Sequence, residues 1–275
     1  MRPSGTLKDH VGEDLENAPA AVLRRGGGGK TALRCRMCER GGLEPVGRTR
    51  GQDYFHCRHC HFVFTPACDE QTAGADGSSY RRTQVYTPEG RWAVDPAFLC
   101  PALERLGHRG PLRILDFGAA DSIVPDLLRQ GGHRVIVLAP ASANPSGNHL
   151  PRPGAGCHPD RITGDIIELN IPEAQFDLTY AYKALEHVAE PRAVLRELLR
   201  LTKPGGYVLI HTAMSDIAGG AAAGESRSRR PAEIDSAACG RFTLRTFEVF
   251  VRGSSHRLVH HDAHTALIQR DAAER

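Results

Sequence analysis

One stretch of this chain, residues 176–212, alternates strand and helix in a way that few folds accommodate. The β-favouring run Phe176–Tyr180 follows a proline-bearing loop and predicts a buried strand. Pro191 suits the first position of a helix, and apolar side chains then recur at helical spacing over residues 194–199. We place Lys203 in the last turn of this helix. Strands and helices that alternate in this way build a parallel sheet covered by helices on both faces.

The end of the predicted helix also locates a ligand-binding edge. Pro204–Gly206 should stop the helix before a second buried strand, which we expect over Tyr207–Ile210. Ligands of parallel sheets bind beyond the carboxyl ends of the strands. Tyr182–His187 directly follows the first of the two strands, so we expect it at that edge.

The same alternation occurs upstream. Arg113–Gly118 predicts a strand that runs into a tight turn, and apolar residues over 123–128 then form a helical face. Arg134–Leu138 predicts the next strand, which completes a βαβ unit whose first turn should hold a ligand at a helix N-terminus. Ile162–Ile166 predicts a further strand, whose end carries the acid Asp165.

Four segments in a fixed order give the chain a family resemblance. They are ILDFGAADS, TGDIIEL, FDLTYAYKALEHV and LTKPGGYVLIHT, beginning at residues 114, 163, 176 and 201. In order and spacing they resemble class I S-adenosylmethionine-dependent methyltransferases, over roughly Leu112 to Thr212. The glycine turn alone is a weak signal, whereas the ordered set is specific. The resemblance implies a Rossmann-like, doubly wound α/β sheet and methyl transfer from S-adenosylmethionine.

The resemblance also implies a cofactor site. Its residues would be Asp116, Gly118, Ala120, Pro140, Asp165, Ile166 and Ala181. Asp116 and Gly118 match the acid and first glycine of the methionine-binding turn. Asp165 matches the acid that accepts a hydrogen bond from the adenine amino group, between apolar contacts from Ile166 and Pro140 on the ring faces. Ala181 matches the strand end whose backbone meets the methionine portion.

Three positions depart from the family pattern. Ala120 and Ser122 stand where later glycines of the turn are usual, and Ala139 stands where an acid usually holds both ribose hydroxyls. Losing such a charge-assisted hydrogen bond costs about 1.5–3 kcal/mol, or roughly tenfold to a hundredfold in affinity. Asp121 is a candidate substitute. These departures leave open the alternative of a catalytically weak or inactive methyltransferase-like binding protein.

Methyl transfer itself needs few side chains, because the sulfonium is already an activated electrophile. A base is needed only where the acceptor carries a proton at neutral pH. His187 is our candidate base and Tyr182 our candidate positioning group, since both follow the strand that ends at the ligand-binding edge. The alternative for His187 is a structural histidine at a helix start.

Two C-x-x-C pairs precede the sheet. Cys35 and Cys38 are followed, after 18 intervening residues, by Cys57 and Cys60. This spacing is typical of structural zinc, since four thiolates close a tetrahedral site and leave no open position. A thioredoxin-type redox pair would need a βαβ context that is missing around these cysteines. We therefore predict an N-terminal zinc ribbon with a structural Zn²⁺.

The ribbon is basic, which raises a second functional alternative. Its cations are Lys30, Arg34, Arg36, Arg40, Arg48, Arg50 and Arg58, against three acids. An RNA methyltransferase could hold its substrate on such a ribbon, with Tyr54 as the available stacking aromatic because Phe55 should be core. The simpler interpretation is a solvated surface. We favour a small-molecule methyl acceptor over nucleic acid, because the net charge of the chain is only +3.

Length and composition indicate one large domain and a small one within 275 residues. We expect a disordered N-terminus over 1–30, the zinc ribbon over 31–67, a linker and helix over 68–110, and a methyltransferase-like domain over 111–275 with a mobile loop at 215–232. Within the last domain, a helix over 244–251 and a hairpin of strands 257–260 and 266–269 should close the sheet.

The remaining cysteines bear on the cellular compartment. Cys68, Cys100, Cys157 and Cys239 are scattered, and we expect them to be unpaired thiols in a reducing interior. The sequence has no apolar run of membrane-spanning length and no signal-peptide core in residues 1–30. We therefore expect a cytoplasmic protein that does not contact the membrane.

Overall fold

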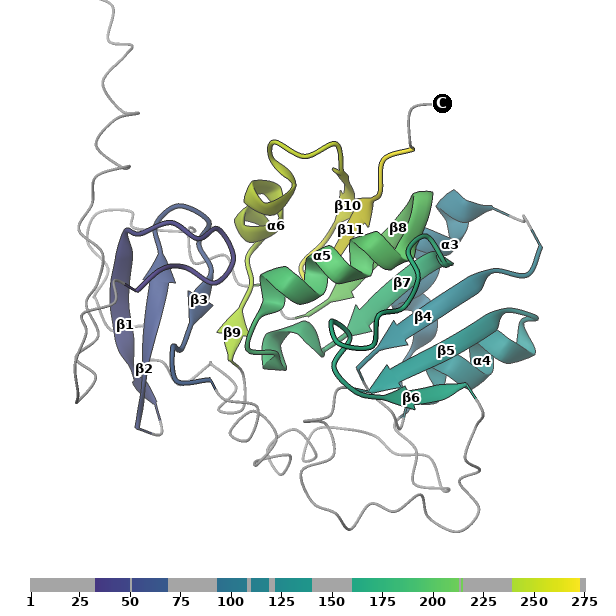
Figure 1. Cartoon of the computed structure of the whole chain (residues 1–275), viewed down its shortest axis with the longest axis horizontal. Coiled ribbons are helices and arrows are strands. Elements are labelled where there is room, and N and C mark those ends of the chain that lie inside the picture. The colour runs from purple at the N-terminus through teal and green to yellow at the C-terminus, as the bar shows by residue number, and fades with distance from the viewer. Residues whose placement is uncertain are drawn as a thin grey trace, which may run out of the picture.

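Figure 1 shows a computed structural model of the chain, in which a small sheet lies beside a larger helix-covered sheet. The structure describes residues 33–49, 51–68, 93–107, 110–118, 122–139, 160–212, 214 and 239–272. The predicted disordered N-terminus and the predicted mobile loop at 215–232 lie outside these ranges.

The larger sheet has seven strands in the order β10-β11-β8-β7-β4-β5-β6. The parallel strands are β4 (Arg113–Phe117), β5 (Arg134–Ala139), β6 (Arg161–Thr163), β7 (Phe176–Tyr182) and β8 (Thr202–His211). The antiparallel strands at one edge are β10 (Arg257–His261) and β11 (Thr265–Gln269). This arrangement confirms the predicted doubly wound α/β sheet and its closing hairpin.

Successive side chains of each central strand point to opposite faces of the sheet and pack into two separate apolar layers. In β4, Leu115 joins the layer that packs against α5 (Pro191–Leu201) and α6 (Leu244–Val251). Ile114 joins the opposite layer with η1 (Pro96–Leu99), α3 (Cys100–Leu106) and α4 (Val124–Gln130). A strand buried on both faces needs such apolar residues at every position, which explains the continuous hydrophobic runs.

Three predicted boundaries were wrong. The helix α5 ends at Leu201, and Lys203 lies in β8, where its Nζ contacts Asp177 Oδ1 at 2.7 Å. Thr202, a β-branched residue, already takes the extended conformation and pairs with Phe176. The Pro-Gly-Gly segment is an irregularity inside the strand. Upstream, β6 ends at Thr163, so the expected strand end at Asp165 is a turn.

The smaller sheet contains a strand from the far end of the chain. Its order is β1-β2-β3-β9, with β1 (Leu43–Thr49), β2 (Gln52–Cys57), β3 (Val63–Phe64) and β9 (Gly240–Arg241). At Gly240 a side chain would collide with the Phe62 ring, so the close approach of the two segments requires glycine. The buried Thr246 of α6 also donates a hydrogen bond to Cys60 O at 3.0 Å.

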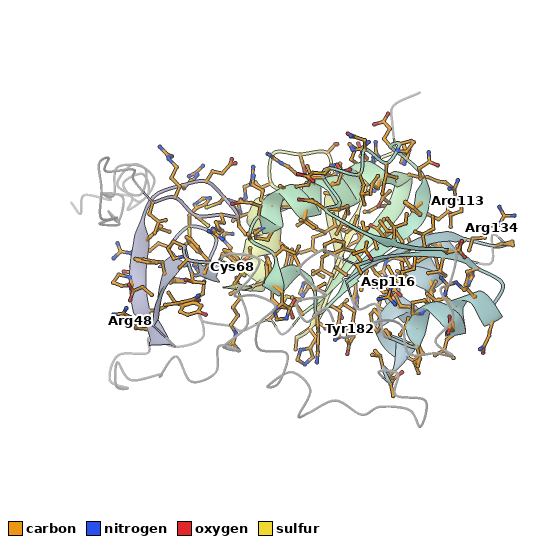
Figure 2. The ribbon with its side chains drawn as sticks, turned by 60° about the horizontal axis from the view of Figure 1, so that its bottom comes forward. Arg48, Cys68, Arg113, Asp116, Arg134 and Tyr182 are labelled. Atoms are coloured by element: carbon orange, nitrogen blue, oxygen red, sulfur yellow. A yellow bond between two sulfur atoms is a disulfide. The ribbon has the colours of Figure 1, made fainter. Side chains whose placement is uncertain are left out.

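Figure 2 shows how far apart the two ends of this body are. Arg113 and Arg134, at the starts of β4 and β5, lie at one end, and Arg48 of the ribbon strand β1 lies at the other. Asp116 and Tyr182 lie between them, toward the carboxyl ends of their strands.

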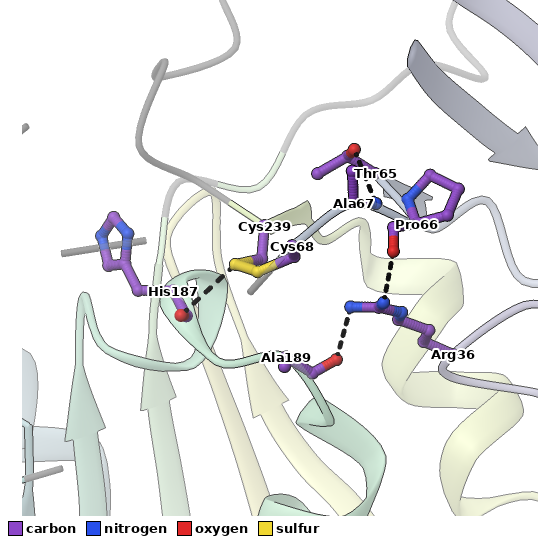
Figure 3. The surroundings of a disulfide bond; sticks show 8 residues. All are labelled: Arg36, Thr65, Pro66, Ala67, Cys68, His187, Ala189 and Cys239. Atoms are coloured by element: carbon purple, nitrogen blue, oxygen red, sulfur yellow. Dashed lines mark hydrogen bonds between the residues drawn. A yellow bond between two sulfur atoms is a disulfide. The ribbon is translucent and has the colours of Figure 1, made fainter. Parts of the chain in front are cut away.

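Figure 3 shows a disulfide at the junction of ribbon and core. Cys68 and Cys239, which we expected to be unpaired thiols, are joined, with their Cα atoms 5.2 Å apart. The sequence prediction was wrong because β9 returns the chain to β3 and brings together two cysteines 171 residues apart. Beside them, Arg36 donates hydrogen bonds to Ala189 O and Pro66 O, which further ties the ribbon to the core.

Candidate cofactor site and metal centre

The glycine turn after β4 has the backbone geometry that the sequence predicts. Gly118 has φ 137°, a conformation that disfavours other residues, and its N–H donates to Leu138 O at 3.0 Å. A Cβ at Gly118 would lie 2.5 Å from Ala184 Cβ, because the segment after β7 presses on the turn. The turn therefore stays close to the ends of both neighbouring strands.

Asp116 is a buried carboxylate below this turn, with an exposure of only 1%. The β4–β7 register pairs it with Tyr180, and its Oδ2 makes no hydrogen bond with any residue that the structure describes. Burial raises the pKa of Asp116 to about 7, and the nearby Tyr180 hydroxyl and Arg129 guanidinium offset only part of this effect. A charged form of Asp116 would thus be stabilised further by a cation at Oδ2, the oxygen to which no described residue donates a hydrogen bond.

The adenine side of the predicted site is a turn after β6. Asp165 Oδ1 accepts a hydrogen bond from Ile167 N at 2.8 Å, which fixes the carboxylate at the start of the turn. Gly164 N donates to Ala139 O at 3.1 Å and holds this turn against the end of β5. Ile166 is 2% exposed and belongs to the core layer, so little of its side chain is left to cover a ring.

The site's strand ends lie next to one another, as the resemblance implies. Ala181 pairs with Phe117, the residue before Gly118, and Ala139 ends β5 on the other side. Ala139 is buried, so the described part of β5 ends without a carboxylate for the ribose hydroxyls. Ala120, Asp121 and Pro140 lie outside the described residues.

These residues fit the methionine and adenine portions of S-adenosylmethionine but not its ribose. A buried carboxylate with one unpartnered oxygen next to a glycine turn suits the methionine ammonium, and the fixed carboxylate of Asp165 suits an amino group. The ribose position, at Ala139, offers no charge. When bound, this cofactor would supply an electrophilic methyl group, which none of the protein side chains can provide.

The two residues predicted for catalysis are placed differently. His187 closes the short helix η3 (Leu185–His187), and its imidazole points away from the disulfide, whereas its carbonyl oxygen lies 3.4 Å from Cys239 Sγ (Figure 3). Tyr182 ends β7, and its ring is stacked on His211 with centroids 4.7 Å apart and an interplanar angle of 2°.

His211 was missed by the sequence interpretation. The ring centroid of Phe98, in η1, lies 4.7 Å from that of Tyr182 and 5.2 Å from that of His211. The three rings therefore form one cluster at the carboxyl edge of the sheet. Burial, followed by repulsion from His264 and Lys183, lowers the pKa of His211 to about 4, so its imidazole is neutral at pH 7. The available signal was that His211 ends the strand paired with β7, since parallel register brings such ends together.

The four predicted zinc ligands converge. Their Sγ atoms all lie within 4.8 Å of one another, with Cys35 to Cys60 at 3.4 Å and Cys38 to Cys57 at 3.5 Å. Zn–S bonds of about 2.3 Å in a tetrahedron separate sulfurs by about 3.8 Å, so the donor set fits zinc. Each C-x-x-C turn ends in a left-handed residue, Glu39 with φ 63° and His61 with φ 60°.

The fold and this arrangement of strand ends define a class I S-adenosylmethionine-dependent methyltransferase, as the sequence motifs predicted. Comparison with known proteins agrees: residues 92–260 match the family of methyltransferase domains, and the chain belongs to that family. No helix among the described residues has the length and apolar character needed to cross a membrane.

Among curated relatives, the ubiquinone biosynthesis O-methyltransferase of Pseudomonas fluorescens Pf-5 is 32% identical over 111 residues, which are 40% of this chain and 47% of the relative. The protein of the same name from Stutzerimonas stutzeri is 31% identical over 102 residues, 36% of this chain and 44% of the relative. The chain spans about half the length of the curated relatives it matches.

Among solved structures, the 1,6-didemethyltoxoflavin-N1-methyltransferase of Burkholderia thailandensis, with 1,6-didemethyltoxoflavin and S-adenosylhomocysteine bound, has a TM-score of 0.48 and 16% identity. That alignment covers 78% of this chain and 98% of the other.

Proposed function

We propose that this chain transfers a methyl group from S-adenosylmethionine to a small-molecule acceptor. The observation that carries the proposal is Asp116, a buried carboxylate with no hydrogen bond to Oδ2 from the described residues, held below a glycine turn at the carboxyl edge. Burying an unpaired carboxylate is costly unless a ligand compensates it. The methionine ammonium is a cation of suitable size and place.

For the acceptor, we favour a flat molecule with a hydroxyl group. The ring cluster of Phe98, Tyr182 and His211 offers aromatic faces at the same edge. Two relatives are named as O-methyltransferases of ubiquinone biosynthesis, which supports oxygen as the acceptor atom. Aligning such a hydroxyl with the sulfonium, away from water, supplies most of the catalysis.

The cofactor site is tested by calorimetric titration of the zinc-loaded chain with S-adenosylmethionine and S-adenosylhomocysteine. We expect binding that Asp165→Ala weakens roughly tenfold to a hundredfold, because the adenine amino group loses a charged acceptor. Glu168→Ala, an exposed acid in the same turn, is the control and should leave affinity unchanged. If neither ligand binds the unaltered chain, Ala139 has cost the site its function, and the alternative of an inactive binding protein stands.

His187 is the proposed base for a hydroxyl acceptor. We expect His187→Gln to lower kcat by about a hundredfold and to leave cofactor affinity unchanged, because a positioned base contributes 10²–10⁴-fold. The measurement is transfer of a radiolabelled methyl group to a panel of phenols and catechols. His261→Gln, at the exposed end of β10, is the matched control. An unaltered kcat in His187→Gln would assign His187 a structural role and direct attention to Tyr182.

A further inference from the structure

A basic groove lies between α5 and the end of α6, remote from the proposed cofactor site. It is a hollow of about 350 Å³ lined by Arg192, Arg196, Arg200, Arg252, Arg270 and His256. Figure 1 shows the two helices side by side, with α6 above α5. Neither the methyltransferase motifs nor the proposed reaction uses any of these residues.

The helix α5 presents its three arginines as a row. Arg192, Arg196 and Arg200 follow one another at intervals of four residues, so they lie on one helix face about 6 Å apart along the axis. The opposite face of the same helix is fully apolar and packs on the sheet. Arg196 and Arg252 are exposed at the surface.

Backbone carbonyls hold several of these guanidinium groups without neutralising them. Arg270 Nη1 donates to Leu199 O at 3.2 Å and Arg200 O at 2.6 Å, in the last turn of α5. Arg192 Nη1 donates to Met37 O in the ribbon. A hydrogen bond to a carbonyl fixes the orientation of an arginine, and the full positive charge remains.

The groove contains more arginines than acidic partners. Arg192 approaches Glu39 Oε2 at 3.5 Å, and Arg200 contacts Glu197 Oε1 at 2.6 Å. The described residues provide no ion pair for Arg196, Arg252 or Arg270. Glu173 and Asp271 also lie near enough to attract Arg200 and His256. Three of the five guanidinium groups thus have no carboxylate of the described residues within contact distance.

The positive surface continues onto the ribbon. A second hollow of about 130 Å³ lies at the other end of α6 and is lined by Arg40, Arg58, His59, His61 and Arg245. Glu44 pairs with Arg58, and Glu248 pairs with Arg245. Among the described residues, Arg40 has no ion-pair partner, so its positive charge is not balanced. The helix α6 and Arg252 at its end connect the two hollows.

We propose that this groove binds the phosphodiester backbone of single-stranded nucleic acid. Arginine is the side chain best suited to phosphate, because its planar fork donates two parallel hydrogen bonds. A row of evenly spaced guanidinium groups matches the regular repeat of phosphates along a strand. The half-buried ring of Phe250 lines the groove, and the Arg192 guanidinium lies over it, 5.9 Å from its centroid.

The same residues disfavour a membrane surface as the ligand. The exposed large apolar side chains of the described chain are Val46, Leu127, Ile167 and Leu169. None of them lines the groove, so an amphipathic anchor is missing there. Tyr54, which we expected to be available for stacking on the ribbon, is 1% exposed and cannot serve, so the nucleic-acid surface is the groove and not the ribbon alone.

The test is fluorescence anisotropy of a labelled 20-nucleotide oligo(U) with the full zinc-loaded chain. We expect binding at 50 mM KCl that weakens as salt is added. A plot of the logarithm of the association constant against log[salt] should have a slope of about −2, which corresponds to three phosphate contacts on a single strand. Arg196→Glu and Arg252→Glu should each weaken binding by at least about tenfold. Arg134→Glu, the same charge change at the exposed start of β5, should leave it unchanged (Figure 2).

Three results would overturn the proposal. They are no binding at 50 mM KCl, an equal loss in Arg134→Glu, or tighter binding to anionic phospholipid vesicles or poly-glutamate than to oligo(U). Thermal melts of the variants exclude unfolding as a cause, since Arg196 and Arg252 are exposed and their replacement should shift Tm by no more than a few degrees. Cofactor titration is a separate readout, so failure of the methyltransferase proposal would leave this one standing.

Discussion

Removal of zinc will unfold the ribbon and lower the Tm of the whole chain by more than about 10 °C. Structural zinc sites in small modules contribute apparent binding free energies of about 10–16 kcal/mol, comparable to the entire stability of a domain. The sheet around the four cysteines has strands as short as two residues, so it cannot persist on backbone pairing alone.

The loss will spread beyond the ribbon because the ribbon and the core share apolar contacts. The ring centroids of Phe62 and Phe242 are 4.9 Å apart, and those of Phe242 and Phe247, in α6, are 5.4 Å apart. All three rings are buried, so an unfolded ribbon would leave them in water. We therefore expect one coupled transition and not a separate, silent loss of the small module.

The measurement combines metal analysis with thermal melts before and after chelation. The unaltered chain should carry one zinc ion, and Cys57→Ser should reproduce the chelated state, since Cys57 is a buried ligand. Cys100→Ser is the matched control, because Cys100 is an exposed free thiol outside the cluster. A chain that contains no zinc and melts at the same temperature in chelator would show that the cysteine cluster is not a metal centre.

Asp116→Asn will stabilise the chain at pH 8, in the absence of cofactor, by up to about 4 kcal/mol. The pKa of Asp116 is about 7 in the folded chain and about 3.8 when unfolded. Below pH 4 both states bind the proton, and between pH 4 and 7 only the folded state does, so stability falls as pH rises through this window. The upper limit follows from about 1.4 kcal/mol for each unit of pKa difference.

Melts of both proteins at pH 4, 6 and 8 test this expectation. The stability advantage of Asp116→Asn should be small at pH 4 and grow toward pH 8, whereas Asp53→Asn, at an exposed position, should give no such trend. S-adenosylmethionine should raise the Tm of the unaltered chain at pH 8 and have much less effect on the Asn variant. A variant that is less stable than the unaltered chain at pH 8 would mean that Asp116 is already compensated inside the protein.

The parts of the fold that local chemistry determines were predictable from the sequence. The helix Leu244–Val251 has the predicted bounds because Thr243 forms a capping box with Thr246 and the apolar period is regular. The start of β8 was not predictable, since Pro204–Gly206 has the composition of a turn and only pairing with β7 makes it part of a strand. At such positions, hydrogen bonding to the neighbouring strand outweighs the local preference of the residues for a turn.

The candidate site divides in the same way. The glycine turn and the cysteine pairs depend on residues adjacent in sequence, and their geometry follows from spacing. The stack of Tyr182 on His211 depends on the register of two parallel strands, which no local pattern specifies. The disulfide between Cys68 and Cys239 depends on a return of the chain over 171 residues, and the sequence alone offered no reason to pair them.

The pairing of β9 with β3 has a consequence for biosynthesis. During translation, the ribbon leaves the ribosome long before Gly240 and Arg241 are made. Until then the β3 edge of its sheet has no partner strand. Zinc can be captured at this stage, because all four ligands lie within residues 35–60. Metal loading would then precede completion of the sheet, and the nascent ribbon, already metallated, would serve as the template onto which the C-terminal segment docks.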